Sequence, residues 1–208
     1  MLLLTPEVCE RAPRGLLEEL GDAIDIVQVR PKPLGASRGP APARATFELA
    51  LEALDVLGTG ENAPLVLVDD RVDVAAALWS RGVAGVHLGA DDAPPRVARD
   101  LLGPAPLVGL STHSLQEVVL AEDEPVDYLG FGPVNPTTTK GYEQGLGPER
   151  AWVASSAAPR PLFPIGGIDA TNADTLAEVG RAAVGAVLLT AERPREVALA
   201  LRAALSPE

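Results

Sequence analysis

The chain has 208 residues, a formal net charge of −12 and 47% hydrophobic residues. This length suits one domain with a large core, and the negative charge argues against nucleic acid or an anionic membrane as partner. No apolar run approaches the roughly 18–20 residues of a membrane-spanning helix, and the opening Met1–Thr5 is too short for a secretion signal. Because Cys9 is the single cysteine, no internal disulfide can form. We therefore expect a soluble protein of the reducing cytoplasm.

Eight short apolar runs along the chain predict eight buried strands. They are Leu2–Leu4, Ile24–Val29, Leu65–Val68, Gly85–Leu88, Leu107–Leu110, Tyr128–Phe131, Leu162–Ile165 and Val184–Leu189. Helical patterns lie between them, such as the apolar positions 47, 50, 51 and 54, and Ser114 with Glu117 forms a capping-box signature. Alternation of strand and helix at this length predicts an α/β fold, a single (β/α)8 TIM barrel over residues 1–208.

Polar side chains gather where the predicted strands end, which is where such barrels carry their functional groups. In chain order they are Gln28, Arg30 and Lys32, then Asp69 and Asp70, then His87, Asp91 and Asp92, then Ser111 and His113. Asp70 and Asp92 follow neighbouring strands and could jointly hold Mg²⁺, which prefers hard oxygen ligands. Asp91 competes with Asp92 for this role. Asp70 and Asp92 could instead each cap a helix.

The segment Gly130–Lys140 joins glycines, prolines and threonine hydroxyls to a single lysine. Small residues allow close approach of a ligand and hydroxyls bind oxyanions, so the segment suits a phosphorylated substrate; the alternative is a turn with a solvated lysine. Arg30, Lys32 and Lys140 can neutralise a diphosphate. Gly166–Gly167 and the amides near Thr190 follow the last two predicted strands, the usual phosphate site of such barrels. Two separate anion sites imply two phosphorylated substrates.

Six segments in order resemble the thiamine-phosphate synthase family over nearly the whole chain. They are Asp25–Lys32, Val68–Asp73, Gly85–Gly89 with Asp92, Gly109–His113, Asp127–Lys140 and Ile165–Ile168. The family joins 4-amino-2-methyl-5-hydroxymethylpyrimidine diphosphate to 4-methyl-5-(2-phosphoethyl)thiazole and releases pyrophosphate. The resemblance implies a transferase whose substrates are small phosphorylated molecules, with a homodimer as one possible assembly.

The resemblance also implies a role for each matching residue. Those expected at the pyrimidine diphosphate are Gln28, Arg30, Lys32, Asp69, Ser111 and Lys140, of which Arg30, Lys32 and Lys140 would be catalytic. Those expected at the thiazole phosphate are Thr137, Thr139, Gly166, Gly167, Leu189 and Thr190. Asp70 and Asp92 would ligate Mg²⁺. No general base is required if the diphosphate leaves first and the thiazole nitrogen attacks the resulting cation.

The chain departs from the family pattern at several positions. Asp69 replaces an amide and places a carboxylate beside the diphosphate, which is unfavourable unless the metal or Arg71 compensates. Ala90, Asn135 and Thr190 also differ from the common residues. Two other functions compete: a thiazole tautomerase-like isomerase of the same barrel family, and a noncatalytic phosphate-metabolite binding protein. The isomerase family carries a histidine in the loop after the sixth strand and lacks the complete Thr-x-Thr-Lys, whereas this chain has no histidine there and keeps Lys140. A sensor for thiazole phosphate alone has no need for Asp70, Asp92 and Lys140 together.

Overall fold

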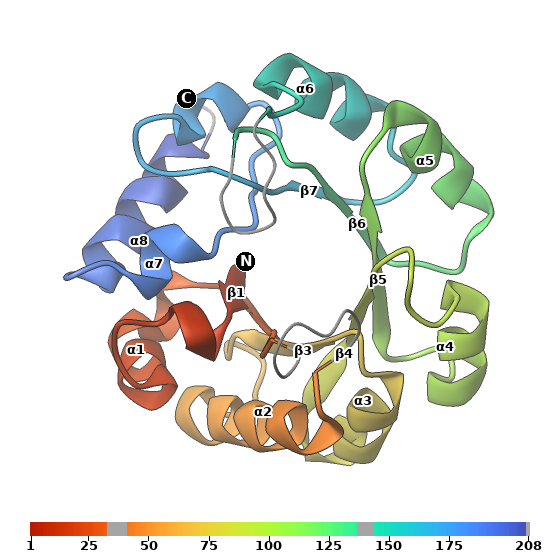
Figure 1. Ribbon diagram of the computed structural model, residues 1–208, viewed down its shortest axis with the longest axis vertical. Helices are drawn as coiled ribbons and strands as arrows, with labels where there is room; N and C mark the ends of the chain where they lie inside the picture. Colours follow the sequence, from red (N-terminus) through yellow and green to blue (C-terminus); the bar gives the residue numbers. More distant parts are fainter. Residues whose placement is uncertain (33–40, 137–143, 207–208) are drawn as a thin grey trace.

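The computed structural model describes residues 1–32, 41–136 and 144–206 of the chain. Its sheet is parallel, and its seven strands follow one another in chain order. The strands are β1 (Leu2–Leu4), β2 (Ile26–Val29), β3 (Leu65–Asp69), β4 (Val83–Leu88), β5 (Leu107–Thr112), β6 (Tyr128–Phe131) and β7 (Leu162–Pro164). The sheet curls around the centre of the molecule, with the helices outside it (Figure 1).

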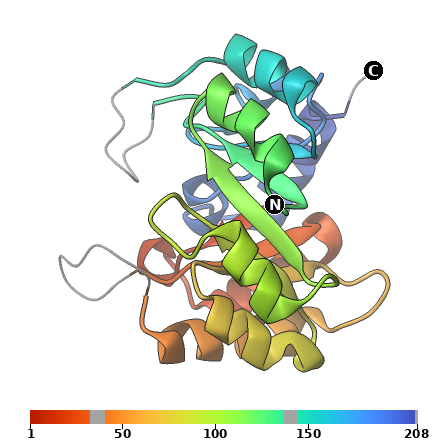
Figure 2. The same cartoon turned by 90° about the vertical axis from the view of Figure 1, so that its right-hand side faces the viewer.

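Helices connect successive strands and cover the outer face of the sheet. The α-helices are α1 (Pro13–Leu20), α2 (Ala43–Leu57), α3 (Val72–Leu78), α4 (Pro95–Leu102), α5 (Leu115–Leu120), α6 (Pro148–Ala157), α7 (Ala186–Leu189) and α8 (Pro194–Ala204). Short 3-10 turns span Pro6–Val8, Gly21–Ala23, Trp79–Arg81, Ala121–Asp123 and Ala173–Leu176. The side view shows β5 between α4 and α5 (Figure 2). No helix in the described part of the chain is long and apolar enough to cross a membrane.

Local sequence signals account for the helix boundaries. The α2 helix buries one apolar stripe that includes Leu49, Ala53 and Leu54, and it stops at Gly58, whose φ of 75° favours glycine. At the start of α5, the Ser114 side chain accepts a hydrogen bond from the Glu117 amide at 3.2 Å. The predicted helix at positions 47–54 is thus confirmed, and so is the Ser114 half of the capping box, whereas the Glu117 side chain accepts from the His113 amide at 2.6 Å.

The eighth predicted strand, Val184–Leu189, is wrong. Its last four residues form α7, and the amides of Leu188 and Leu189 donate to the Gly185 carbonyl at 2.9 and 3.2 Å. Only isolated bridges occur here: Val184 pairs with Leu2, and Ala183 pairs with Ile165. The helix buries Leu188 and Leu189 as completely as a strand would, so hydrophobicity alone did not distinguish the two. The structure shows an α/β fold with seven parallel strands and does not confirm a full (β/α)8 barrel.

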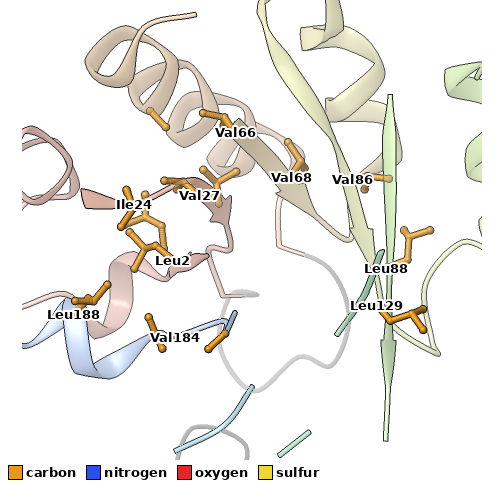
Figure 3. Close-up of a cluster of buried hydrophobic side chains, with 14 of the residues drawn as sticks. Leu2, Ile24, Val27, Val66, Val68, Val86, Leu88, Leu129, Val184 and Leu188 are labelled. Carbon is orange, nitrogen blue, oxygen red and sulfur yellow. The ribbon is translucent and has the colours of Figure 1, made fainter. Parts of the chain in front are cut away.

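The hydrophobic core is continuous between the sheet and the helices around it. Leu2, Val27 and Val66 lie together in the close-up, and Val184 and Leu188 approach them from the chain's last third (Figure 3). All five side chains are buried. This packing fixes the strands, so the polar groups at their carboxyl ends are held on a rigid support.

Candidate active site

Asp69 is the centre of a partly buried ion pair at the carboxyl end of the sheet. Its carboxylate accepts from the side-chain amide of Gln28 on β2 and, at 2.9 Å, from Nε of Arg30, which directly follows β2. Gln28 and Arg30, two of the predicted strand-end residues, thus reach the same carboxylate. Arg71, predicted as a compensating charge for Asp69, instead pairs with Asp73 at 2.8 Å. Arg30 compensates Asp69, because it reaches the carboxylate from the adjacent strand.

Asp70 and Asp92 are brought together beside this ion pair. Burial, the charge of Asp69, and the hydrogen bond and charge of Asp92 raise the pKa of Asp70 to about 8, opposed in part by Arg30. Asp70 adopts a left-handed backbone with φ of 61°, while Asp92 Oδ2 accepts from the Gly89 amide at 2.7 Å. Asp92 rather than Asp91 thus lies against Asp70, and neither Asp70 nor Asp92 is the residue that caps the following helix.

Asp70 and Asp92 provide two carboxylate ligands for a metal ion, fewer than a complete coordination shell needs. Among the described residues, no group of three or more His, Cys, Asp or Glu side chains is arranged to hold a metal ion. Mg²⁺ is commonly held by one or two carboxylates together with phosphate oxygens and waters. The proton that Asp70 retains also marks a place where positive charge is favoured. Asp70 and Asp92 therefore fit Mg²⁺ that arrives with a diphosphate.

A second polar network crosses the interior from β4 to β6. His87 Nδ1 lies 2.9 Å from the Tyr128 hydroxyl, and His87 Nε2 lies 2.9 Å from Ser111 Oγ. Burial, followed by the charges of Asp69 and Asp127, raises the pKa of Tyr128 well above its usual value, so this phenol stays protonated. A neutral His87 with its proton on Nε2 satisfies both contacts and leaves the Ser111 hydroxyl proton available to a ligand.

The sequence did not predict Tyr128 as part of this network, nor Gly109 as the position that makes room for the Tyr128 ring. A Cβ at Gly109 would lie 2.1 Å from the Tyr128 ring, so only glycine leaves room for the phenol. Their positions pair directly across β5 and β6. A glycine in the interior of an apolar strand is the sequence signal that could have indicated such a close approach.

The Gly166–Gly167 turn lies at the other side of the same rim, after β7. Both glycines have positive φ, 100° and 58°. Asn135, which follows β6, donates from its backbone amide to the Gly166 carbonyl and from its side chain to the Gly167 carbonyl, both at 3.1 Å. A Cβ at Gly167 would meet the Pro136 oxygen at 2.5 Å. The two hydrogen bonds from Asn135 thus hold the turn against the start of the loop after β6.

The remaining predicted residues fall into three groups. Lys32 is exposed beyond the end of β2. The amide and hydroxyl of Thr190 both donate to the Ala186 carbonyl, at 3.0 and 2.9 Å, and the Leu189 amide donates within α7. The predicted phosphate contact through these two amides is therefore not supported, since α7 already uses them. Thr137, Thr139 and Lys140 lie outside the described residues.

Comparison with known proteins places this geometry in a family. Residues 2–188 match the protein family described as thiamine monophosphate synthase. The chain belongs to this family. Thiamine-phosphate synthase of Mycobacterium sp. (strain KMS) is 40% identical over 206 residues, covering 94% of this chain and 88% of that one. The Corynebacterium jeikeium thiamine-phosphate synthase is 38% identical over 179 residues, covering 83% and 79%.

Solved structures agree with the family assignment. Thiamine phosphate pyrophosphorylase from Pyrococcus furiosus has a TM-score of 0.80 at 29% identity and covers 98% of this chain and 94% of its own. Orotidine 5'-phosphate decarboxylase from Pyrococcus horikoshii has a TM-score of 0.67 at 15% identity, covering 99% of each chain. The second likeness shows the fold alone. The polar residues at the carboxyl ends of the strands are therefore the candidate active site of this family member.

Proposed function

We propose that the protein is a thiamine-phosphate synthase. It would join 4-amino-2-methyl-5-hydroxymethylpyrimidine diphosphate to 4-methyl-5-(2-phosphoethyl)thiazole, giving thiamine phosphate and pyrophosphate. The observation that carries this proposal is the Asp70–Asp92 pair beside Arg30 at the rim of a chain in this family. Neither a thiazole isomerase nor a phosphate sensor needs two adjacent carboxylates for a metal-bound diphosphate.

The diphosphate half of the site is built from β2, β3 and β4. Asp70 and Asp92 would hold Mg²⁺, which supplies charge neutralisation for the diphosphate oxygens when bound. Asp69 engages Arg30 only through Nε, and within the described residues the terminal nitrogens of Arg30 have no acceptor. Asp69 therefore orients the guanidinium while leaving its terminal N–H groups free for phosphate oxygens. Lys32 and Lys140 would add the remaining positive charge.

The pyrimidine would lie beside the buried network. The Ser111 hydroxyl, oriented by His87, and the Gln28 side chain, held by Asp69, offer hydrogen bonds to an aminopyrimidine. Both groups are held by partners within the protein. This preorganisation lowers the cost of orienting the ring for departure of the diphosphate.

The thiazole phosphate would occupy the opposite half of the rim. We keep Thr137, Thr139, Gly166 and Gly167 as its contacts, and we transfer the backbone contact expected at Leu189 and Thr190 to Gly185. Gly185 directly follows the bridged residues Ala183 and Val184, so it stands where the eighth strand of a (β/α)8 barrel would end. On this proposal, residues 183–184 are that strand in reduced form.

The reaction needs positioned charge rather than a protein base. The bond between the pyrimidine methylene carbon and the diphosphate oxygen breaks, and its electron pair leaves on the diphosphate. The cation spreads into the aminopyrimidine, and the thiazole nitrogen lone pair then forms the new carbon–nitrogen bond. Arg30, Lys32 and Lys140 would stabilise the growing negative charge of the leaving group, where electrostatic contributions are largest.

The direct test is pyrophosphate release measured in a coupled assay with both substrates and Mg²⁺. Turnover should require both substrates and be lost in the Asp70→Ala, Asp92→Ala double variant. Asp91→Asn is a matched control because Asp91 is exposed and adjacent in sequence. Absence of pyrophosphate release from the folded wild-type protein would refute the proposed function. Cytoplasmic location and a homodimer stay predictions.

A further inference from the structure

A cavity of about 340 Å³ lies at the amino ends of the strands, opposite the rim that carries the polar networks. It separates α8 from the sheet around the starts of β1 and β2. Ile24, Val184 and Leu188, which lie together around Leu2 in Figure 3, form part of its wall, and α8 contributes Ala198 and Leu201. The space is open to solvent on one side and most of its lining is apolar, so it suits a small guest that becomes partly buried.

Charged groups of both signs line the mouth of the cavity. Arg202 pairs with Asp25 at 2.8 Å, so these two charges offset each other. Arg181 also lines the cavity, is exposed, and forms no ion pair or hydrogen bond with any residue that the structure describes. The Met1 amino group donates to the Ala182 carbonyl at 2.9 Å, and burial lowers its pKa to about 6. Among the described residues that line the cavity, Arg181 is therefore the one side-chain charge without a partner near pH 7.5.

We propose that this cavity binds a small monocarboxylate with an apolar body. The carboxylate would pair with Arg181, whose planar guanidinium matches its geometry, while the body packs against the partly exposed lining residues Ile26, Phe163 and Leu205. An apolar cavity of about 150 Å³ holds a benzene molecule, so the present volume accommodates roughly 10–13 non-hydrogen atoms. This site uses none of the rim residues and is independent of the proposed synthase activity.

The test compares 3-phenylpropionate with 3-phenylpropionamide, which has the same shape without the charge. Calorimetric titration at pH 7.5 should show the carboxylate binding about three- to tenfold more tightly, the range expected of a partly exposed charged hydrogen bond. Amide shifts in ¹H–¹⁵N spectra should centre on residues 181–188 and on α8. Arg181→Gln should remove the preference for the carboxylate. The control Arg150→Gln removes an exposed guanidinium on α6 and should leave the preference unchanged.

The cavity itself is tested by filling it. Ala198→Leu places a larger side chain in the wall and should abolish binding of both probes while the protein retains its circular dichroism spectrum. If that variant fails to fold, the chemical-shift map of the wild-type protein decides the location. Millimolar 3-phenylpropionate without detectable binding, shifts confined to other surfaces, or an undiminished carboxylate preference in Arg181→Gln would each overturn the proposal.

Discussion

The raised pKa of Asp70 makes a prediction about stability that needs no substrate. The folded protein holds the Asp70 proton up to a pKa of about 8, whereas the ordinary pKa of an aspartate side chain is 3.8. The stability from this proton is complete below the unfolded pKa and is lost as the pH rises through about 8. In metal-free buffer, Asp70 should therefore make the wild-type protein progressively less stable from acidic to mildly alkaline pH.

The size of the effect follows from that pKa. From pH 5.5 to 8 the linkage amounts to at most about 3.4 kcal/mol, at 1.36 kcal/mol per pH unit, and solvent screening of this partly exposed group reduces it to roughly 1–2 kcal/mol. For a chain of this length, that corresponds to a fall in Tm of about 3–6 °C. Met1 acts in the opposite direction, since its lowered pKa of about 6 makes stability rise with pH. The difference between two proteins must therefore be measured.

The assay is thermal unfolding in EDTA between pH 5.5 and 8.5 for the wild type and Asp70→Asn. Asparagine tolerates the left-handed backbone of position 70 and cannot ionise, so the difference in Tm between the proteins should change by 3–6 °C across this range. Asp91→Asn is the control and should follow the wild type. Parallel pH profiles for the wild type and Asp70→Asn would refute the reasoning, because the carboxyl group would then titrate normally.

The remaining predictions concern turnover and packing. Lys140→Ala should lower kcat by roughly two to three orders of magnitude, with a smaller change in KM for the thiazole phosphate, and Lys140→Arg should restore only part of it; near-normal kcat in steady-state kinetics would identify a solvated lysine. Tyr128→Phe should cost about 1–2 kcal/mol in urea unfolding, because the His87 nitrogen loses its buried partner, and an unchanged midpoint would contradict that bond. Gly109→Ala should cost about 1–3 kcal/mol through the clash with the Tyr128 ring; a wild-type unfolding midpoint would show that the ring moves freely.

Strand and helix positions followed from the sequence wherever length and periodicity agreed. The seven runs that became β1–β7 are short, flanked by turn residues and buried. The run Val184–Leu189 has a similar composition, and its glycine does not set it apart, because the runs of β4, β5 and β6 also contain glycine. The Gly185 carbonyl nevertheless begins a helical turn. A short apolar run cannot distinguish a strand from a buried helix by period alone.

Contacts in the candidate site were predictable where the two residues follow adjacent strands. They were not predictable where the contact depends on the register between strands. Asp70 and Asp92 lie in the segments that follow the neighbouring strands β3 and β4, so their proximity could be inferred. The contact of His87 with Tyr128 depends on the register of three strands and on the space left at Gly109. No pattern within one segment contains that information.

The weak seam between β7 and β1 gives the two halves of the rim different local stabilities. There the described residues connect β7 to β1 through the amides of Leu3, Val184 and Ala183 and the Met1 amino group, whereas β2 to β5 share ladders of several residues. Segments with few backbone hydrogen bonds open first in native-state hydrogen exchange. Amides of residues 183–189 should therefore exchange through a local opening that leaves Asp69, Asp70 and their neighbours closed. In the proposed function, the half of the rim near Gly185 would loosen to release a phosphorylated product while the other half stays assembled for the next diphosphate.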